Sequence, residues 1–111
     1  MEKRSAHYPL ERVKAVVALL GIHCFTNSAV AGLADMGLTK AEALAAIKAL
    51  KRQHCYKSMT TYASSAIWQD VYHCDTPAGM AYVKFTLIEP TLANPIPRVV
   101  ISFKALQLET P

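Results

Sequence analysis

The sequence predicts an α+β fold in which N-terminal helices pack on one face of a C-terminal antiparallel β-sheet. Apolar residues recur at three- and four-residue steps in the first half of the chain, whereas after Lys51 they alternate with polar residues. Short connections between the later segments favour antiparallel neighbours. A chain of 111 residues with 52% apolar residues suits one core. We therefore expect a single domain at 1–111, helical over about 8–50 and a sheet over about 54–106.

The first predicted helix carries one apolar stripe that ends at Gly21 and is formed by Leu10, Val13, Val16, Val17 and Leu20. Its run "AVVALLGI" has some likeness to a signal peptide, but the run is brief and has helical spacing, so we interpret it as a structural helix. No run approaches the roughly 20 apolar residues that a membrane span requires. We therefore expect no association with a membrane.

Two further helices are predicted before the change of period. The second starts at Thr26–Asn27, where a side chain can cap free backbone N–H groups, and ends at Gly37, since glycine accepts a left-handed backbone. Thr39 and Glu42 have the spacing of a capping box, which predicts a third helix reaching about Leu50.

Four strands are predicted in the second half, at Tyr56–Tyr62, Ile67–Cys74, Met80–Glu89 and Arg98–Leu106. The first two connections, Ala63–Ser65 and Asp75–Gly79, are short enough for hairpins. The third, Pro90–Pro97, contains three prolines, and proline is excluded from central strands. We therefore expect a long excursion between the last two strands.

The formal charge of +4 is unevenly distributed. No carboxylate lies between Glu42 and Asp70, although four cationic residues do: Lys48, Lys51, Arg52 and Lys57. Such a local positive field attracts phosphates or an acidic partner protein. Cations also suit the C-terminal ends of helices, so a solvated helix end remains the alternative.

One face of the predicted sheet combines cations, a phenol and hydroxyl groups. Alternation places Tyr82, Lys84 and Thr86 on one side of their strand, and it places Ser102 and Lys104 together on the last strand. Neither strand puts an acid on that face. The combination favours binding of a nucleic-acid strand, with ammonium groups at phosphates and rings against bases. A plain solvated face, common in antiparallel sheets, is the alternative.

Three His-Cys pairs raise the question of a metal site: His23-Cys24, His54-Cys55 and His73-Cys74. Neighbouring residues on a strand point to opposite faces, so one pair cannot easily serve one ion. We therefore predict packing roles, with no metal and no cofactor. An odd count of three cysteines without a disulfide framework favours reduced thiols and a cytoplasmic protein.

Four segments carry a resemblance to a known family: "YKSMTTY", "IWQDVY", "YVKFT" and "VVISFK". With the opening "MEKR", they resemble the motility quorum-sensing regulator (MqsR) toxins, members of the RelE-like mRNA interferases. The resemblance implies a RelE-like toxin of a type II toxin–antitoxin system, an endoribonuclease that cuts mRNA at short GC-containing triplets such as GCU. It also implies a cognate MqsA-like antitoxin partner.

The resemblance assigns four catalytic positions, which are Lys57, Gln69, Tyr82 and Lys104. The RNA is expected to contact four further residues, which are Tyr56, Lys84, Arg52 and Ser102. Cleavage without metal uses the substrate 2′-hydroxyl as nucleophile, so the protein must hold that geometry, stabilise the anionic phosphorus and move protons. The two lysines suit the anion and Tyr82 suits proton donation, while Gln69 is either a polar contact to RNA or a hydrogen-bonded core residue.

Two other functions remain open from the sequence. A domain of the same fold can keep an RNA-binding surface without the chemistry, and it would then act as a regulatory domain. A protein that only binds an antitoxin-like repressor is a third possibility. Growth arrest on expression separates the endoribonuclease from both of these alternatives.

Overall fold

The computed structural model describes residues 1–107, and it confirms the predicted α+β class. After a two-residue strand at the N-terminus come three α-helices, at Leu10–Leu20 (α1), Asn27–Met36 (α2) and Lys40–Lys48 (α3). One short 3₁₀ turn, at Gly21–Cys24, follows α1, and a second, at Arg52–His54, follows α3 and leads into the next strand. The strands are Glu2–Lys3 (β1), Cys55–Thr60 (β2), Trp68–Thr76 (β3), Gly79–Ile88 (β4) and Arg98–Ala105 (β5).

The helix ends follow the capping residues that the sequence indicates. The Thr26 hydroxyl accepts a hydrogen bond from the backbone N–H of Ala29, and Thr39 and Glu42 form the expected capping box. Gly37 ends α2 in the left-handed conformation, with φ of 73°. The third helix ends at Lys48, slightly before the predicted Leu50. Of the helices within residues 1–107, none combines the length and the apolar character that crossing a membrane demands.

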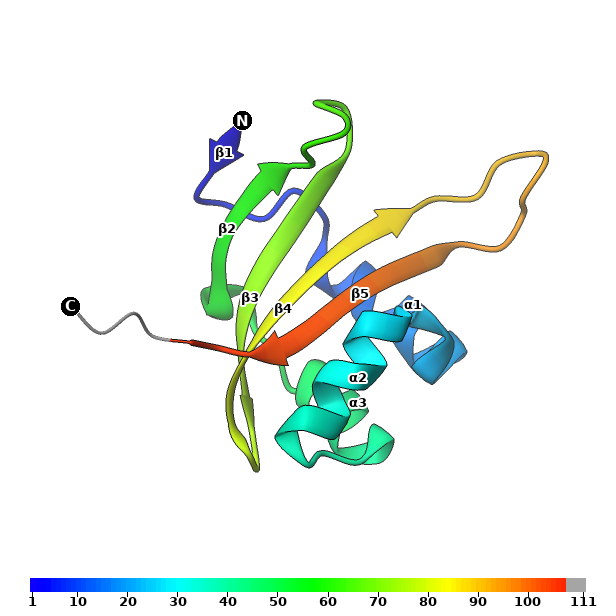
Figure 1. The fold of residues 1–111 in the computed structure, drawn as a ribbon. Helices are drawn as coiled ribbons and strands as arrows, with labels where there is room; N and C mark the ends of the chain where they lie inside the picture. Colours follow the sequence, from blue (N-terminus) through cyan, green and yellow to red (C-terminus); the bar gives the residue numbers. More distant parts are fainter. Residues whose placement is uncertain (108–111) are drawn as a thin grey trace.

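The strands form one antiparallel sheet in the order β1-β2-β3-β4-β5 (Figure 1). The four predicted strands are present with ends shifted by at most two residues, and the proline-containing segment connects β4 to β5 as expected. The sequence analysis missed β1, which pairs Glu2 with Met59 and Lys3 with Ser58 of β2. A strand of two residues is too short to show a period of two.

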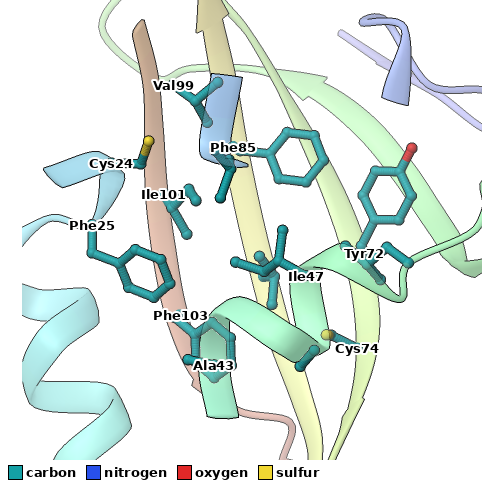
Figure 2. Close-up of a cluster of buried hydrophobic side chains, with 14 of the residues drawn as sticks. Cys24, Phe25, Ala43, Ile47, Tyr72, Cys74, Phe85, Val99, Ile101 and Phe103 are labelled. Atoms are coloured by element: carbon teal, nitrogen blue, oxygen red, sulfur yellow. The ribbon is translucent and has the colours of Figure 1, made fainter. Parts of the chain in front are cut away.

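The helices cover one face of the sheet, and the core lies between them (Figure 1). Figure 2 shows Ile47 of α3 among side chains from three strands, which include Tyr72, Phe85 and Phe103. Tyr72 stacks on Phe85 with 5.0 Å between ring centroids. Burial is the largest cause raising the pKa of the Tyr72 phenol. Because successive residues alternate between faces, this packing leaves the other side of β3, β4 and β5 uncovered by helices.

Other segments of the chain cover the outer sides of β5 and β2. At one edge α2 lies against β5, and the backbone N–H and the hydroxyl of Thr26 both donate to the carbonyl of Ile101. A Cβ atom added to Gly32 would come within 1.9 Å of the Phe103 carbonyl oxygen, so only glycine permits this approach. At the other edge β1 covers β2. Covered edges do not present unpaired N–H and C=O groups to other chains.

A buried carboxylate anchors the N-terminal segment to the sheet. Asp70 on β3 is fully buried and accepts hydrogen bonds from the backbone N–H groups of His7 and Tyr8, each at 2.9 Å. The Ser58 hydroxyl donates to the same carboxylate at 2.6 Å. A buried charge is tolerated when its lone pairs are occupied in this way. The segment that these bonds hold is the one that carries β1 to the edge of β2.

Candidate active site on the open face of the sheet

The face of the sheet opposite the helices, which we call the open face, carries two rows of functional side chains. In the first row His73, Tyr82 and Lys104 are paired across β3, β4 and β5. The second row lies two residues away along these strands. There Val71 of β3 pairs with Lys57 of β2 and with Lys84 of β4, and Lys84 pairs in turn with Ser102 of β5. The polar members of both rows are half-buried or exposed, so their side chains remain within reach of a ligand.

The first row continues into β2 as an unbroken set of ring contacts. Tyr56 stacks on His73 with 4.5 Å between centroids and 19° between planes. His73 lies 6.3 Å from the Tyr82 ring, and the Nζ atom of Lys104 lies 5.4 Å from the centroid of that ring. At the other end the Nζ atom of Lys57 lies 5.7 Å from the Tyr56 ring. Rings Tyr56, His73 and Tyr82, here called the aromatic row, therefore have an ammonium group at each end.

An irregularity in β2 explains how two neighbours reach the same face. Cys55 pairs with Tyr72 and Lys57 pairs with Val71, so the register shifts and Tyr56 is an extra residue in its strand. Regular alternation would send the side chains of Tyr56 and Lys57 to opposite faces. A β-bulge redirects side chains and is frequent next to active sites. Here it brings both the ring and the ammonium group to the open face.

The aromatic row borders a hollow of ≈ 850 Å³. Its walls come from the C-terminal half of α2, from the four strands β2 to β5 and from the chain after β5, and they are formed by Gly32, Asp35, Met36, Tyr56, His73, Tyr82, Lys104, Ala105, Leu106 and Gln107. Asp35 contributes a carboxylate that strand alternation could not reveal, because it comes from a helix. The hollow gives a ligand access to the phenol of Tyr82 and to the ammonium group of Lys104 together.

Lys57 is held by an ion pair with a residue far away in the sequence. Its Nζ atom lies 2.8 Å from Oε1 of Glu2 on β1. The hydrogen bond to Glu2 raises the pKa of Lys57, and the same bond lowers the pKa of the Glu2 carboxyl. The Glu2 side chain keeps 62% of its exposure and that of Lys57 keeps 26%. A stronger anion arriving from solvent can therefore replace the carboxylate at the lysine.

Seven of the eight predicted site residues lie on the open face, which are Lys57, Gln69, Tyr82, Lys104, Tyr56, Lys84 and Ser102. Gln69 pairs with Met59 and is half-buried on this face, so the alternative of a core position is removed. It lies four residues from His73, about 13 Å along β3. The catalytic and RNA-binding roles of these seven residues remain predictions.

Arg52 is the exception. It lies in the second 3₁₀ turn and lines a different hollow of ≈ 510 Å³, together with Arg4 and the core residue Tyr72. That hollow opens on the helix-covered side of the sheet, because Tyr72 faces the core. The structure therefore does not bring Arg52 to the open face, and its predicted contact with RNA there has no geometric support.

The three His-Cys pairs do not gather. Within residues 1–107 no group of three or more His, Cys, Asp or Glu side chains is placed to hold a metal ion. Cys24 and Cys74 are buried and Cys55 is half-buried. Burial raises the pKa of the Cys74 thiol to about 11, as expected of a packed thiol. The pair His73-Cys74 divides between the two faces, so its imidazole joins the open face while its thiol joins the core.

His73 lines the hollow in the middle of the aromatic row, although it is not among the predicted site residues. The sequence analysis treats it only as half of a possible metal pair, although alternation places it on the same face as Val71 and on the other face from Tyr72. Its position beside Tyr82 depends on the β3–β4 register, which pairs the two residues directly. No signal within β3 alone indicates which residue of β4 will stand opposite.

Comparison with known proteins agrees with this geometry. Residues 5–105 match the family described as "Motility quorum-sensing regulator, toxin of MqsA". The chain is also 36% identical over 104 residues to the mRNA interferase toxin MqsR of Escherichia coli (strain K12), covering 94% of this chain and 98% of that protein. The match therefore includes the strands that carry the open face as well as the helices beneath them. On this evidence the chain belongs to the motility quorum-sensing regulator (MqsR) toxin family.

Proposed function

We propose that this protein is an mRNA interferase, an endoribonuclease that acts as the toxin of a toxin–antitoxin pair. The observation that carries the proposal is the aromatic row, flanked by Lys57 and Lys104, on the face of the sheet opposite the helical core. The name of the Escherichia coli relative supports the same activity. An array of rings and cations with solvent access suits an unpaired RNA strand, whose bases can stack and whose phosphates need positive charge.

The proposed reaction needs no metal. The 2′-oxygen of one ribose attacks the adjacent phosphorus, the bond to the 5′-oxygen breaks, and a 2′,3′-cyclic phosphate and a 5′-hydroxyl form. Lys104, beside Tyr82, stabilises the added negative charge on the phosphate oxygens, and Lys57, at the other end of the aromatic row, holds an adjoining phosphate of the strand. Lysine is ordinarily charged at neutral pH, and the hydrogen bond to Glu2 raises the pKa of Lys57 further in the free protein. Tyr82, next to Lys104, gives its phenolic proton to the departing 5′-oxygen.

The remaining open-face residues would position the substrate. Tyr56 is 53% exposed, so the outer side of its ring is available to stack on a base. Lys84 and Ser102 are direct partners across β4 and β5 in the second row and are suited to neighbouring phosphate and ribose oxygens. Gln69 lies farther along β3, where an amide can read the edge of a base. Preference for a GC-containing triplet such as GCU would then arise around Gln69 and Tyr56.

A protein antitoxin is the expected partner, in keeping with the family description, which names a toxin of MqsA. The positive open face would attract an acidic surface as readily as it attracts RNA. We propose an MqsA-like protein in this role. A pull-down with the product of the neighbouring reading frame tests the partner separately from the chemistry.

The test of the proposed function is cleavage of a defined RNA containing GCU in the presence of EDTA. Wild-type protein should yield cyclic phosphate ends, and Lys57→Ala should slow the reaction by about 10²-fold or more. Lys48→Ala is the matched control, because Lys48 is exposed on α3 away from the open face. Cleavage that stops with the chelator and returns with zinc or magnesium would contradict the metal-free mechanism.

A non-catalytic RNA-binding domain is the second candidate, and one observation favours it. Glu2 neutralises Lys57, one of the two cations that the mechanism requires. If Glu2 stayed in place with RNA bound, the face would bind without cleaving. Induced expression separates the candidates, because the endoribonuclease should arrest growth and the binding domain should not.

A further inference from the structure

We propose that His73 is the general base that removes the proton from the substrate 2′-hydroxyl. This inference rests on the proposed endoribonuclease function and supplies a step that the predicted residues leave unassigned. Two ammonium groups cannot accept a proton, Tyr82 is assigned as the donor, and an amide such as Gln69 does not titrate. An imidazole is the side chain best suited to accept a proton near neutral pH.

The geometry of His73 fits this role. It lies on β3 in the middle of the aromatic row, half-buried, with its ring held against Tyr56 at 4.5 Å and 19°. Stacking fixes the plane of an imidazole while leaving its edge nitrogens free. Within residues 1–107 His7 and His54 use their Nδ1 atoms in hydrogen bonds, with Lys3 Nζ and with the backbone N–H of Lys51 respectively. The ring of His73 instead borders the hollow.

The distance to Tyr82 allows the two groups to act on one linkage. The ring centroids lie 6.3 Å apart with 42° between planes, and the two residues are direct partners across β3 and β4. In-line displacement needs a base at the attacking oxygen and an acid at the leaving oxygen of the same phosphorus. His73 would take the 2′-proton as the 2′-oxygen bonds to phosphorus, and Tyr82 would protonate the 5′-oxygen as its bond breaks. One proton is accepted and one is donated, so the step balances.

The titratable and charged side chains around the His73 imidazole come from four elements. Tyr56 and Lys57 approach from β2, and Tyr82 and Lys84 belong to β4. Lys104 of β5 and Asp35 of α2 line the same hollow. Tyrosine, lysine and aspartate side chains ordinarily titrate outside pH 5–8, whereas imidazole titrates within it. A rise in cleavage rate across that interval would therefore report the loss of a proton from His73.

The competing role for His73 is that of a stacking platform, and substitutions can separate the two. His73→Phe keeps a flat ring against Tyr56 but cannot accept a proton, and His73→Gln keeps polarity without a basic nitrogen. His23→Phe is the matched control, because His23 is exposed in the 3₁₀ turn after α1. Thermal unfolding of each variant shows whether the sheet is intact.

The measurement is the single-turnover cleavage rate at saturating RNA from pH 5 to 8 in EDTA, together with binding of the same RNA carrying a 2′-deoxy sugar at the cut site. We expect His73→Phe and His73→Gln to lose about 10²- to 10⁴-fold in rate and to lose the rise with pH, while binding stays within about twofold. A wild-type rate and pH profile in either folded variant would overturn the inference and leave the proposed function standing. A wild-type protein that binds but does not cleave RNA would overturn the proposed function, and the inference with it.

Discussion

The two faces of the sheet are built from the same strands but have opposite characters. Tyr72 and His73 are adjacent in sequence, yet Tyr72 is fully buried against Phe85 while His73 is half-exposed beside Tyr82. The helix-covered face holds the strands in register, and the open face presents rings and cations at the spacing which that register sets. Substitutions on the covered face should therefore act through stability, and those on the open face through activity.

The largest expected effect is on the cleavage rate, and it should appear when a tyrosine hydroxyl is removed from the open face but not when one is removed from the covered face. Tyr82→Phe removes the proposed proton donor and should reduce the cleavage rate by about 10²- to 10⁴-fold, with unfolding unchanged. Tyr72→Phe removes a buried hydroxyl that has no hydrogen-bond partner among the described residues, so neither rate nor stability should fall appreciably. Cleavage assays and thermal melts on both variants check the pair. Equal activity in the two would remove the distinction between the faces.

The next effect concerns the anchor of the N-terminal segment. Asp70→Ala leaves three donors without their acceptor, the N–H groups of His7 and Tyr8 and the hydroxyl of Ser58. The Ser58 hydroxyl is buried and the two N–H groups are part-buried, and a buried donor without a partner costs roughly 1–3 kcal/mol, so we expect a loss of about 3 kcal/mol in the free energy of unfolding. Denaturant unfolding measures it. A stability within about 0.5 kcal/mol of wild type would show that the segment is held by other contacts.

A smaller loss of stability is expected where α2 meets β5. Gly32→Ala places a methyl group against the Phe103 carbonyl and should cost about 1–3 kcal/mol. The better helix propensity of alanine offsets at most about 1 kcal/mol of this. Ala31→Gly on the exposed side of the same helix is the control for propensity alone. If Gly32→Ala were more stable than wild type, the close approach of helix and strand would be wrong.

The smallest effect should come from releasing Lys57. Glu2→Gln removes the carboxylate 2.8 Å from its Nζ atom, so RNA affinity at low salt should rise by about two- to fivefold. Because Lys57 lowers the pKa of Glu2, that carboxylate stays charged at neutral pH and loses its charge only as the pH falls below the usual glutamate range. The two proteins should differ at pH 7 and converge in acid. Weaker binding by Glu2→Gln would mean that the pair positions Lys57 instead of competing for it.

Much of the fold could be read from local signals. The ends of α2 and α3 follow Thr26, Gly37 and the Thr39–Glu42 box, because caps act through neighbouring backbone groups. Alternation also put Tyr82 and Lys84 on one face of β4, which the structure bears out. These features depend on residues within one turn or one strand of each other.

The parts of the site that could not be read depend on pairing between distant segments. Glu2 meets Lys57 across 55 positions, and β1 itself is too short to show periodicity. The bulge at Tyr56 is defined only by how β2 pairs with β3. His73 becomes a neighbour of Tyr82 only once the β3–β4 register is known. Arg52 is the converse case, since it belongs to the same basic cluster in sequence as Lys57 but lines a hollow on the other side of the sheet.

The central claim is that one RNA linkage meets the open face at the aromatic row. Nuclear magnetic resonance of protein with ¹³C-labelled tyrosine rings, titrated with GCU-containing RNA that carries a 2′-deoxy sugar at the cut site, tests this directly. The rings of Tyr56 and Tyr82 should shift on binding, and the buried ring of Tyr72 should not. Saturable binding that leaves Tyr56 and Tyr82 unmoved would place the RNA elsewhere and contradict the account.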